Sequence, residues 1–220
     1  VPREAALFER VAPSVLLIIS RGDGSQGAAG TGVIVSRAGL VLTAAHVVVG
    51  DDGQVADTVL VALKPSELPR RLRDVTDFVA ARVRAVDTTL DVALLEVDVP
   101  DILVPIDLDE RAPRQGAEIW TMGHPQANTF WVLSHGVVLA ETPQGFLTDI
   151  VIAEGESGGP VIDERGRLLG VNTKLSWAAA SGSARAVAIG ARHILRWLQA
   201  LGVRLESPAD HDILSPRSAR

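Results

Sequence analysis

Ser157 is the residue in this sequence whose surroundings best suit covalent chemistry. It stands in the stretch Gly155-Glu156-Ser157-Gly158-Gly159-Pro160, and the apolar pair Val161-Ile162 follows. Glycines on both sides predict a tight turn that leads into a strand. Such a turn frees backbone N–H groups beside the hydroxyl, as a serine nucleophile with an oxyanion hole requires. A glycine-rich surface turn without chemistry is the alternative interpretation.

A serine hydroxyl needs a base to become nucleophilic, and His46 is the best candidate for that base. It follows Leu42-Thr43-Ala44-Ala45, where a predicted strand ends in small residues that leave room around an imidazole. Asp91 is the candidate for the carboxylate that orients the base, because it stands at the mouth of the apolar run Val92–Leu95. Asp87 is its nearest rival and is expected to be more exposed. The alternative interpretations are structural: His46 would be a histidine at a strand end without a catalytic role, and Asp91 would only form the turn that enters a strand.

The glycines around the serine also fit the Gly-x-Ser-x-Gly pattern of the α/β-hydrolases. That fold requires a strand-to-helix elbow and the chain order serine, acid, histidine. Here Pro160 and a β-type run follow the serine. The only downstream histidines are His193, in a predicted helix, and His211, in the tail. The order therefore disfavours an esterase of that fold.

Short β-type runs separated by turn residues must position these candidates. They are Ser14–Ile19, Thr31–Val35, Leu40–Thr43, Thr58–Leu63, Phe78–Val86, Ala93–Val97, Glu118–Met122, Trp131–Ala140, Phe146–Ile152, Val161–Ile162, Leu168–Asn172 and Ala186–Ile189. So many strands predict an all-β chain and are too many for one small barrel. We predict two six-stranded antiparallel β-barrels, over about residues 14–99 and 114–190, joined by a linker rich in Asp and Pro.

Two helices are predicted to flank the barrels. Apolar residues at near-helical spacing indicate a short helix that ends at Pro13, and a second apolar face indicates a closing helix over residues 191–201. Residues 1–203 are interpreted as one domain. Residues 204–220, rich in Ser, Pro and charge, are predicted to be a flexible tail.

Composition narrows the class of protein. The formal net charge of -6 gives no reason to expect nucleic acid as a partner. The chain has no cysteine, which excludes disulfides, thiol catalysis and thiolate metal sites. No histidine pair has zinc-ligand spacing, so no metal and no cofactor are expected. No apolar run reaches the roughly 18–20 residues that span a bilayer, and the chain does not begin like a secretory signal.

The order His46, Asp91, Ser157 in an all-β chain resembles the trypsin-like serine proteases of chymotrypsin fold, and most closely the HtrA (Deg) family. The similar stretches are Phe8–Val15, Gly30–Val35, Thr43–His46, Asp91–Leu95, Met122–Pro125, Ser134–Val138, Thr148-Asp149, Gly155–Pro160 and Gly170–Thr173. They cover roughly residues 8–200. No single motif is specific, but the ordered set is.

The resemblance implies a role for each candidate. Ser157 would attack the scissile carbonyl, His46 would take and return its proton, and Asp91 would hold the tautomer of His46. The backbone N–H groups of Gly155 and Ser157 would form the oxyanion hole. The remaining histidines, among them His124, are interpreted as ancillary.

The resemblance also implies which residues line the primary substrate pocket. They are Val151, Thr173, Lys174, Leu175, Arg185 and Ala186. Val151 is not acidic, so a trypsin-like preference for Arg or Lys lacks its counter-charge. We expect an apolar pocket for a small or medium aliphatic residue. An inward Arg185 would instead favour an acidic residue.

The loop before the serine departs from chymotrypsin-like zymogens. Those carry an aspartate where this chain has Glu156, and it pairs with a newly cut N-terminus. This chain begins Val1-Pro2-Arg3. We therefore expect activity not to depend on N-terminal cleavage and regulation to come from ordering of the loop Ile152–Glu156. HtrA proteins usually carry PDZ domains, and too few residues follow the closing helix here for one.

The predicted function is that of a serine endopeptidase acting on unfolded or exposed polypeptide. A protease-fold binding or scaffolding module with a latent triad is the alternative, and a protease that processes itself in cis is a third hypothesis. The family resemblance makes a trimer possible without fixing the oligomeric state. It also favours an extracytoplasmic, periplasmic or secreted location, which this sequence alone leaves open.

Overall fold

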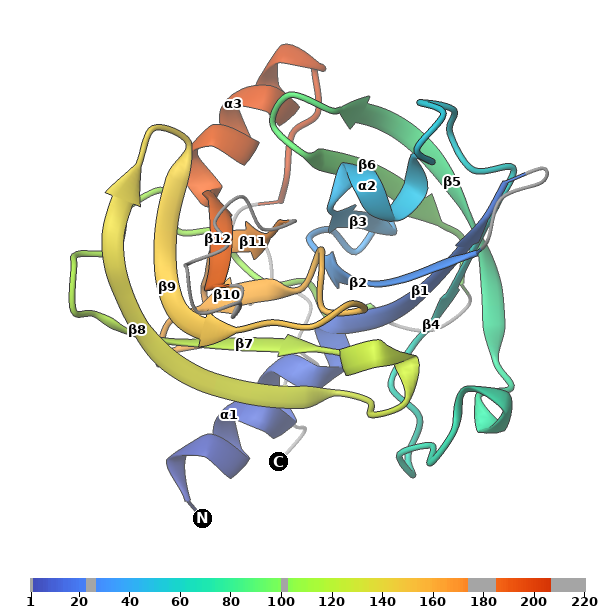
Figure 1. The fold of residues 1–220 in the computed structure, drawn as a ribbon, viewed down its shortest axis with the longest axis horizontal. Helices are drawn as coiled ribbons and strands as arrows, with labels where there is room; N and C mark the ends of the chain where they lie inside the picture. The colour runs from blue at the N-terminus through green and yellow to red at the C-terminus, as the bar shows by residue number, and fades with distance from the viewer. Residues whose placement is uncertain (1, 23–26, 100–102, 174–184, 207–220) are drawn as a thin grey trace, which may run out of the picture.

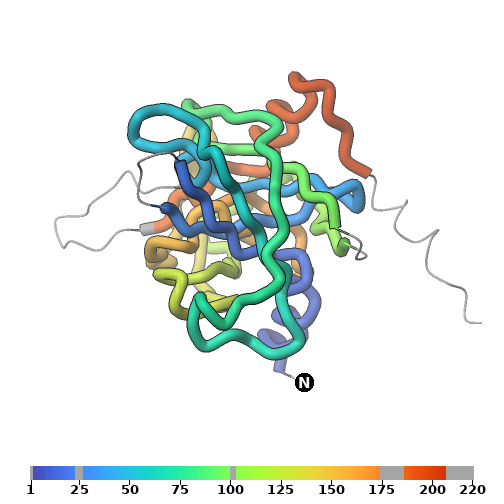
Figure 2. The backbone as a smooth tube through the Cα atoms, turned by 90° about the vertical axis from the view of Figure 1, so that its right-hand side faces the viewer, coloured from blue at the N-terminus to red at the C-terminus, as the bar shows by residue number. Residues whose placement is uncertain are grey.

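The computed structural model describes residues 2–22, 27–99, 103–173 and 185–206 of the chain. Its strands form two closed antiparallel barrels of six strands each (Figure 1). The predicted all-β, two-barrel architecture is therefore confirmed. Seen from the side of the first barrel, the segment from β1 to β6 lies in front of the second barrel (Figure 2).

The first barrel is closed in the strand order β1-β2-β3-β6-β5-β4. Its strands are β1 (Val15–Arg21), β2 (Ala28–Ile34), β3 (Leu40–Thr43), β4 (Thr58–Ala62), β5 (Phe78–Asp87) and β6 (Val92–Val97). The register of β3 and β6 pairs Thr43 with Ala93. This pairing brings the end of β3, which His46 follows, beside the start of β6, which Asp91 precedes.

The second barrel is closed in the order β10-β11-β12-β9-β8-β7. Its strands are β7 (Glu118–Gly123), β8 (Val132–Thr142), β9 (Gly145–Val151), β10 (Pro160–Ile162), β11 (Leu168–Asn172) and β12 (Arg185–Gly190). Strand β10 begins at Pro160, directly after the glycine-rich turn. Proline at the first position of a strand costs no ladder hydrogen bond inside it.

Three α-helices and three single 3₁₀ turns complete the described chain. They are α1 (Arg3–Val11), α2 (Ala45–Val48), α3 (Ala191–Ala200), η1 (Ala12–Ser14), η2 (Leu72–Asp74) and η3 (Pro125–Ala127). The helices α1 and α3 were predicted, whereas α2 was not. A four-residue helix is too short to show helical periodicity in a sequence.

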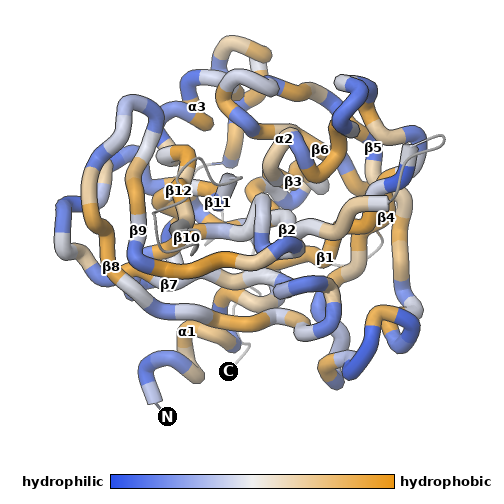
Figure 3. The backbone as a smooth tube through the Cα atoms, in the orientation of Figure 1, coloured by the Kyte–Doolittle hydropathy of each residue, from blue (hydrophilic) through white to orange (hydrophobic). Residues whose placement is uncertain are grey.

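The core is continuous across the two barrels. Leu42 and Leu94 of the first barrel belong to one buried cluster with Trp120 and Met122 of the second, and α1 and α3 add apolar residues to it. Hydrophobic residues follow the strands, while many of the hydrophilic ones lie in the peripheral connections (Figure 3). The shared core fixes one barrel against the other and thereby positions residues that lie between them.

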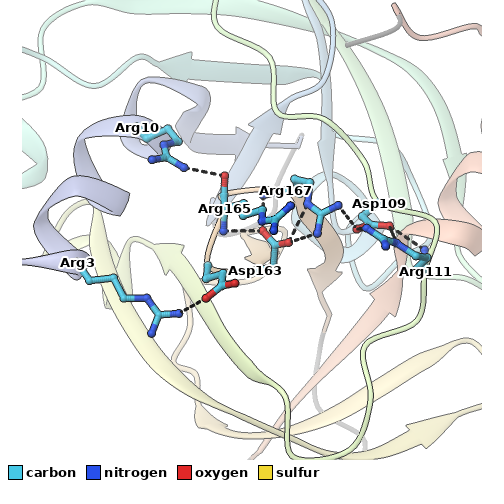
Figure 4. A network of polar contacts seen from close by, with 8 residues as sticks. Arg3, Arg10, Asp109, Arg111, Asp163, Arg165 and Arg167 are labelled. Carbon is cyan, nitrogen blue, oxygen red and sulfur yellow. Dashed lines mark hydrogen bonds and ion pairs between the residues drawn. The ribbon is translucent and has the colours of Figure 1, made fainter. Parts of the chain in front are cut away.

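A network of ion pairs joins α1 and the segment between the barrels to the β10–β11 hairpin (Figure 4). Arg10 donates to the carbonyl oxygen of Arg165. Arg167 Nη1 lies 2.7 Å from Asp109 Oδ2, and Arg167 Nη2 lies 2.6 Å from Asp163 Oδ2. Arg111 Nη2 lies 2.9 Å from Asp109 Oδ2. The network therefore connects α1, the segment between the barrels and the β10–β11 hairpin, which are distant in the sequence.

We expect Asp109→Asn to lower the free energy of unfolding at pH 7 by about 1–2 kcal/mol, because Asp109 is the acceptor of two arginines. The hydrogen bond from Arg111 lowers the pKa of Asp109 below its ordinary value, and the charge of Arg167 adds to this. A lowered pKa in the folded state stabilises the fold above the unfolded-state pKa, and the stabilisation is lost as the pH falls through the folded-state pKa.

The difference between wild type and Asp109→Asn should therefore shrink below about pH 4. Urea denaturation at pH 7 and pH 3 measures it. Asp77→Asn is the control, because Asp77 is exposed and makes no hydrogen bond or ion pair among the described residues. An equal loss of stability in both variants would contradict the assigned role of the network.

Candidate active site

His46 and Asp91 form a hydrogen-bonded pair on the first barrel. His46 Nδ1 lies 2.9 Å from Asp91 Oδ2 and 3.1 Å from Asp91 Oδ1. The backbone N–H of His46, in α2, also donates to Asp91 Oδ1, at 3.1 Å. Because the carboxylate accepts from Nδ1, it holds the proton there and leaves Nε2 as the basic nitrogen. Both side chains are 25% exposed, so the pair is half-buried and still reachable.

The turn between β5 and β6 places Asp91. Asp91 adopts a left-handed backbone conformation, with φ of 55°. The rival Asp87 is used within the same turn, since its Oδ1 accepts from the backbone N–H groups of Thr89 and Leu90. The structure therefore pairs His46 with Asp91 and gives Asp87 the role of shaping the turn.

Ser157 lies on a turn between β9 and β10 that only glycine suits at two positions. Gly155 and Gly158 have φ of 91° and 85°. A Cβ on Gly155 would lie 2.1 Å from the carbonyl oxygen of His124, and one on Gly158 would lie 2.2 Å from that of Thr31. The Ser157 carbonyl accepts from the backbone N–H of Thr31, at 2.9 Å, which ties the turn to β2 of the other barrel. The turn is thus held at the junction of the two barrels.

The N–H groups of Gly155 and Ser157 have no hydrogen-bond partner among the residues that the structure describes. The carbonyls of the same two peptide groups are both engaged. Glu154 O accepts from Gln126 N, and Glu156 O accepts from Gly159 N at 3.0 Å. In a trans peptide the N–H points away from the carbonyl, so these bonds orient both N–H groups. Two oriented, unpaired donors beside a serine suit an oxyanion hole.

Glu156, next to the serine, is buried and closes the loop before it. Its Oε2 accepts from the backbone N–H of Ala153, at 2.7 Å, and its own N–H donates to the Ala153 carbonyl. Burial raises the pKa of Glu156, while the hydrogen bond from Ala153 opposes this rise. Within the described chain, the carboxylate therefore finds its partner inside its own loop.

His46 and Ser157 line one cleft of about 1490 Å³. In the part of the chain described, no hydrogen bond joins the two side chains. Catalytic hydrogen bonds are often long in unliganded enzymes and tighten when substrate binds. Gly155 and Thr173 line the same cleft. The structure therefore brings together the serine, the base and residues 152–157, which carry the predicted oxyanion donors and which we call the oxyanion loop.

The charges in the cleft are of one sign. Its described lining includes the carboxylates Asp51, Asp52, Asp57 and Glu154 and neither lysine nor arginine. Such a lining attracts basic groups and repels acidic ones.

The other residues predicted for the substrate pocket are placed unevenly. Ala186 is buried at the start of β12, and Thr173 is 4% exposed. Val151 is 62% exposed and is not among the residues that line the cleft. Its Cα pairs with that of Arg185 across β9 and β12. Lys174, Leu175 and the side chain of Arg185 lie outside the described residues.

Thr31 and His124 contact the oxyanion loop, and sequence reasoning missed both. The Thr31 hydroxyl lies 2.6 Å from the Gly155 carbonyl oxygen and 3.0 Å from His124 Nδ1. Both residues stand in stretches that resemble the HtrA family, Gly30–Val35 and Met122–Pro125. That position was the one available signal, because their contact joins residues 93 positions apart.

Among the described residues, no group of three or more His, Cys, Asp or Glu side chains is placed to hold a metal ion. No helix in the same residues is both long and apolar enough to cross a membrane.

Residues 30–171 match the protein family described as trypsin-like peptidase domain. The match includes the positions of His46, Asp91 and Ser157. The two barrels and the His46–Asp91 pair lie largely within the matched range.

Individual relatives point to one group of proteases. The chain is 29% identical over 181 residues to serine endoprotease DegS of Escherichia coli K12, covering 74% of this chain and 46% of that protein. It is 29% identical over 161 residues to a probable periplasmic serine endoprotease, DegP-like, of Marinomonas sp., covering 70% and 31%. The chain thus spans less than half the length of these relatives.

A solved structure described as HtrA-type protease AlgW with tripeptide is similar in fold. Its TM-score is 0.73 at 26% identity, covering 90% of this chain and 62% of the other.

Proposed function

Because the chain belongs to the trypsin-like peptidase domain family and resembles the HtrA proteases, we propose that it is a serine endopeptidase in which Ser157 is the nucleophile. The observation that carries this proposal is the hydrogen-bonded pair of His46 Nδ1 and Asp91, in the same cleft as a serine on a glycine-rich turn. The chemistry assigned to each residue follows from this geometry.

In the proposed acylation step, Ser157 Oγ attacks the scissile carbonyl carbon while His46 Nε2 accepts the hydroxyl proton. His46 then returns this proton to the leaving amine, and the acyl group remains on Ser157. Water attacks the acyl-enzyme in the second half, with His46 again acting as the base. The Asp91 carboxylate keeps the Nδ1–H tautomer and stabilises the imidazolium that forms.

The negative charge that develops on the carbonyl oxygen needs donors fixed in advance. The N–H groups of Gly155 and Ser157 are the proposed donors, because their peptide groups are held by bonds to Glu154 O and Glu156 O. One donor of this kind is worth roughly 3 kcal/mol in comparable sites.

The proposed substrates are unfolded or exposed polypeptide segments, since relatives named DegS and DegP-like are endoproteases. For the primary pocket we keep the small or medium aliphatic preference. Two residues of the predicted pocket, Thr173 and Ala186, are buried and carry no charge, which supports this preference. The alternative is an acidic preference set by Arg185.

Cleavage-site profiling on a denatured protein mixture separates these two pocket preferences. Small aliphatic residues before the cut support the proposal, and mainly Asp or Glu before the cut would overturn it in favour of Arg185.

A fluorophosphonate probe tests the proposed nucleophile. We expect the wild-type protein to be labelled at Ser157, and Ser157→Ala to lose labelling and peptide hydrolysis, because Ser157 lines the same cleft as the proposed base His46 and has the proposed oxyanion donors beside it. Ser66→Ala is the control, since Ser66 is exposed in a loop outside the cleft and should keep wild-type labelling. Peptide mapping of the labelled protein identifies the modified residue.

The absence of labelling and hydrolysis in the wild type would favour the binding or scaffolding module with a latent triad. Cleavage of the chain itself at a rate independent of concentration would instead identify a protease that acts in cis.

The cellular location and the oligomeric state are inferred from the family resemblance alone. A DegP-like relative is named as periplasmic, so we propose an extracytoplasmic location. The family resemblance allows a trimer without fixing the oligomeric state, and sedimentation velocity tests it.

A further inference from the structure

The hydroxyl of Thr31 bridges the two barrels directly behind the proposed oxyanion loop. Thr31 lies in β2 and is fully buried. Its Oγ1 lies 2.6 Å from the carbonyl oxygen of Gly155 and 3.0 Å from His124 Nδ1, which both belong to the second barrel. Its backbone N–H donates to Ser157 O. One residue of the first barrel therefore holds the turn on both sides of Glu156.

The direction of these hydrogen bonds follows from the atoms involved. A carbonyl oxygen only accepts, so the single hydroxyl proton of Thr31 must point to Gly155 O. The Thr31 oxygen can then only accept from His124, and His124 Nδ1 must carry a proton. The chain of donation runs from His124 to Thr31 to Gly155.

The surroundings of His124 fix this arrangement. The side chain is fully buried, edge-on to Trp131 with ring centroids 4.6 Å apart, and near Phe130. Its Nε2 has no hydrogen-bond partner among the described residues. Burial lowers the pKa of His124 to about 3, so the ring is neutral at working pH and has one proton to place. Among the described residues, Thr31 Oγ1 is the polar partner of the ring, so a proton on Nδ1 forms a hydrogen bond whereas one on Nε2 would not.

Gly155 is a residue of the turn that such a restraint can hold. It has no side chain to hold it, and its φ of 91° lies in a region that glycine leaves easily. Rotation of the peptide group between Gly155 and Glu156 would also move the neighbouring N–H groups of Gly155 and Ser157. A hydrogen bond to Gly155 O opposes that rotation.

We propose that Thr31, supported by His124, is a positioning residue that holds the oxyanion loop in its active conformation. This inference rests on the proposed peptidase function, because it names a further contact that holds the oxyanion donors of that same site in place. Neither residue touches the substrate: Thr31 acts through Gly155, and His124 acts through Thr31.

Thr31→Val tests the proposal, because valine keeps the shape of threonine and removes the hydroxyl. We measure the inactivation of each variant by a fluorophosphonate as the maximal rate constant and the half-saturating concentration of the probe. Thr31→Val is expected to lower the rate constant by about 10- to 100-fold and to change the half-saturating concentration less than about threefold. Thr31→Ser restores the hydroxyl and should return to within about threefold of wild type.

Ser36→Ala is the matched control. Ser36 is also a buried hydroxyl of the first barrel that accepts one hydrogen bond, from Ala38 N, and donates another, to Glu206 Oε1, and it lies outside the cleft. It should lose a similar amount of stability and keep the wild-type rate constant. Thermal unfolding of all four proteins separates stability from positioning.

Three outcomes distinguish the hypotheses. A wild-type protein that does not react with the probe overturns the proposed function itself. A reactive wild type with an equally reactive Thr31→Val overturns only the positioning role. A slow Thr31→Val with a slow Ser36→Ala also overturns it, because the effect would then be one of general stability.

A measurement on the wild-type protein keeps the inference testable if Thr31→Val does not fold. Long-range ¹H–¹⁵N correlation spectra report which imidazole nitrogen carries the proton, and His124→Gln identifies the signal. We expect His124 as the neutral Nδ1–H tautomer at pH 7. The Nε2–H tautomer would overturn the chain of donation.

Discussion

Asp91→Asn is expected to lower kcat by about 10⁴-fold while the protein still folds and binds peptide. Asp91 Oδ1 accepts from both the backbone N–H and Nδ1 of His46. If the asparagine oxygen keeps the backbone bond, its NH₂ group faces Nδ1 with a donor. His46 must then present Nδ1 as an acceptor and carry its proton on Nε2, where it cannot receive the proton of Ser157.

Asp91→Asn should change catalysis without disturbing the fold. Asp91 has φ of 55°, and asparagine adopts this left-handed conformation as easily as aspartate. Asp87→Asn is the matched control, because Asp87 lies in the same turn and its Oδ1 can be replaced by the amide oxygen. Steady-state hydrolysis of a fluorogenic peptide measures both. An Asp91→Asn protein within tenfold of wild type, or an equally impaired Asp87→Asn, would contradict the role assigned to Asp91.

The sequence predicted the barrels and the His46–Asp91 pair for the same physical reason. Short apolar runs broken by glycine and polar turns have few ways to bury their faces, so the strand count determined the architecture. The candidate base and acid each lie at the end of an apolar strand, and strand ends meet where neighbouring strands pair. In the structure, Thr43 at the end of β3 pairs with Ala93 near the start of β6, which brings the two strand ends together.

The Thr31–His124 contact could not be predicted in the same way. It depends on how one barrel sits against the other, and no local pattern encodes that distance. His124 was interpreted as ancillary because it stands in a predicted turn or strand end and shares no zinc-ligand spacing with another histidine. The strand patterns do not determine the preference of the substrate pocket either, because that preference depends on which side chains point into the pocket.

Gly155→Ala is expected to reduce the rate of acylation by at least about 100-fold while leaving the two barrels folded. The added Cβ would lie 2.1 Å from the His124 carbonyl oxygen and 3.2 Å from the Gln126 and Ala127 nitrogens. These are backbone atoms, which cannot turn aside as a flexible side chain would, so the loop itself must move. Movement there displaces the N–H of Gly155, one of the two proposed oxyanion donors. Fluorophosphonate inactivation rates measure the loss.

An alanine at position 155 has two costs: the left-handed backbone conformation and the close contact of its Cβ with backbone atoms. The variant Gly116→Ala distinguishes them. Gly116 has φ of 80°, but a Cβ there meets no atom within 4 Å. Gly116→Ala therefore bears only the backbone cost of a left-handed alanine, about 1–2 kcal/mol of stability, and should keep wild-type acylation. If both variants lose stability and only Gly155→Ala loses acylation, the contact behind the oxyanion loop is what activity requires. Wild-type acylation in Gly155→Ala would mean that the oxyanion donors do not depend on the position of this loop.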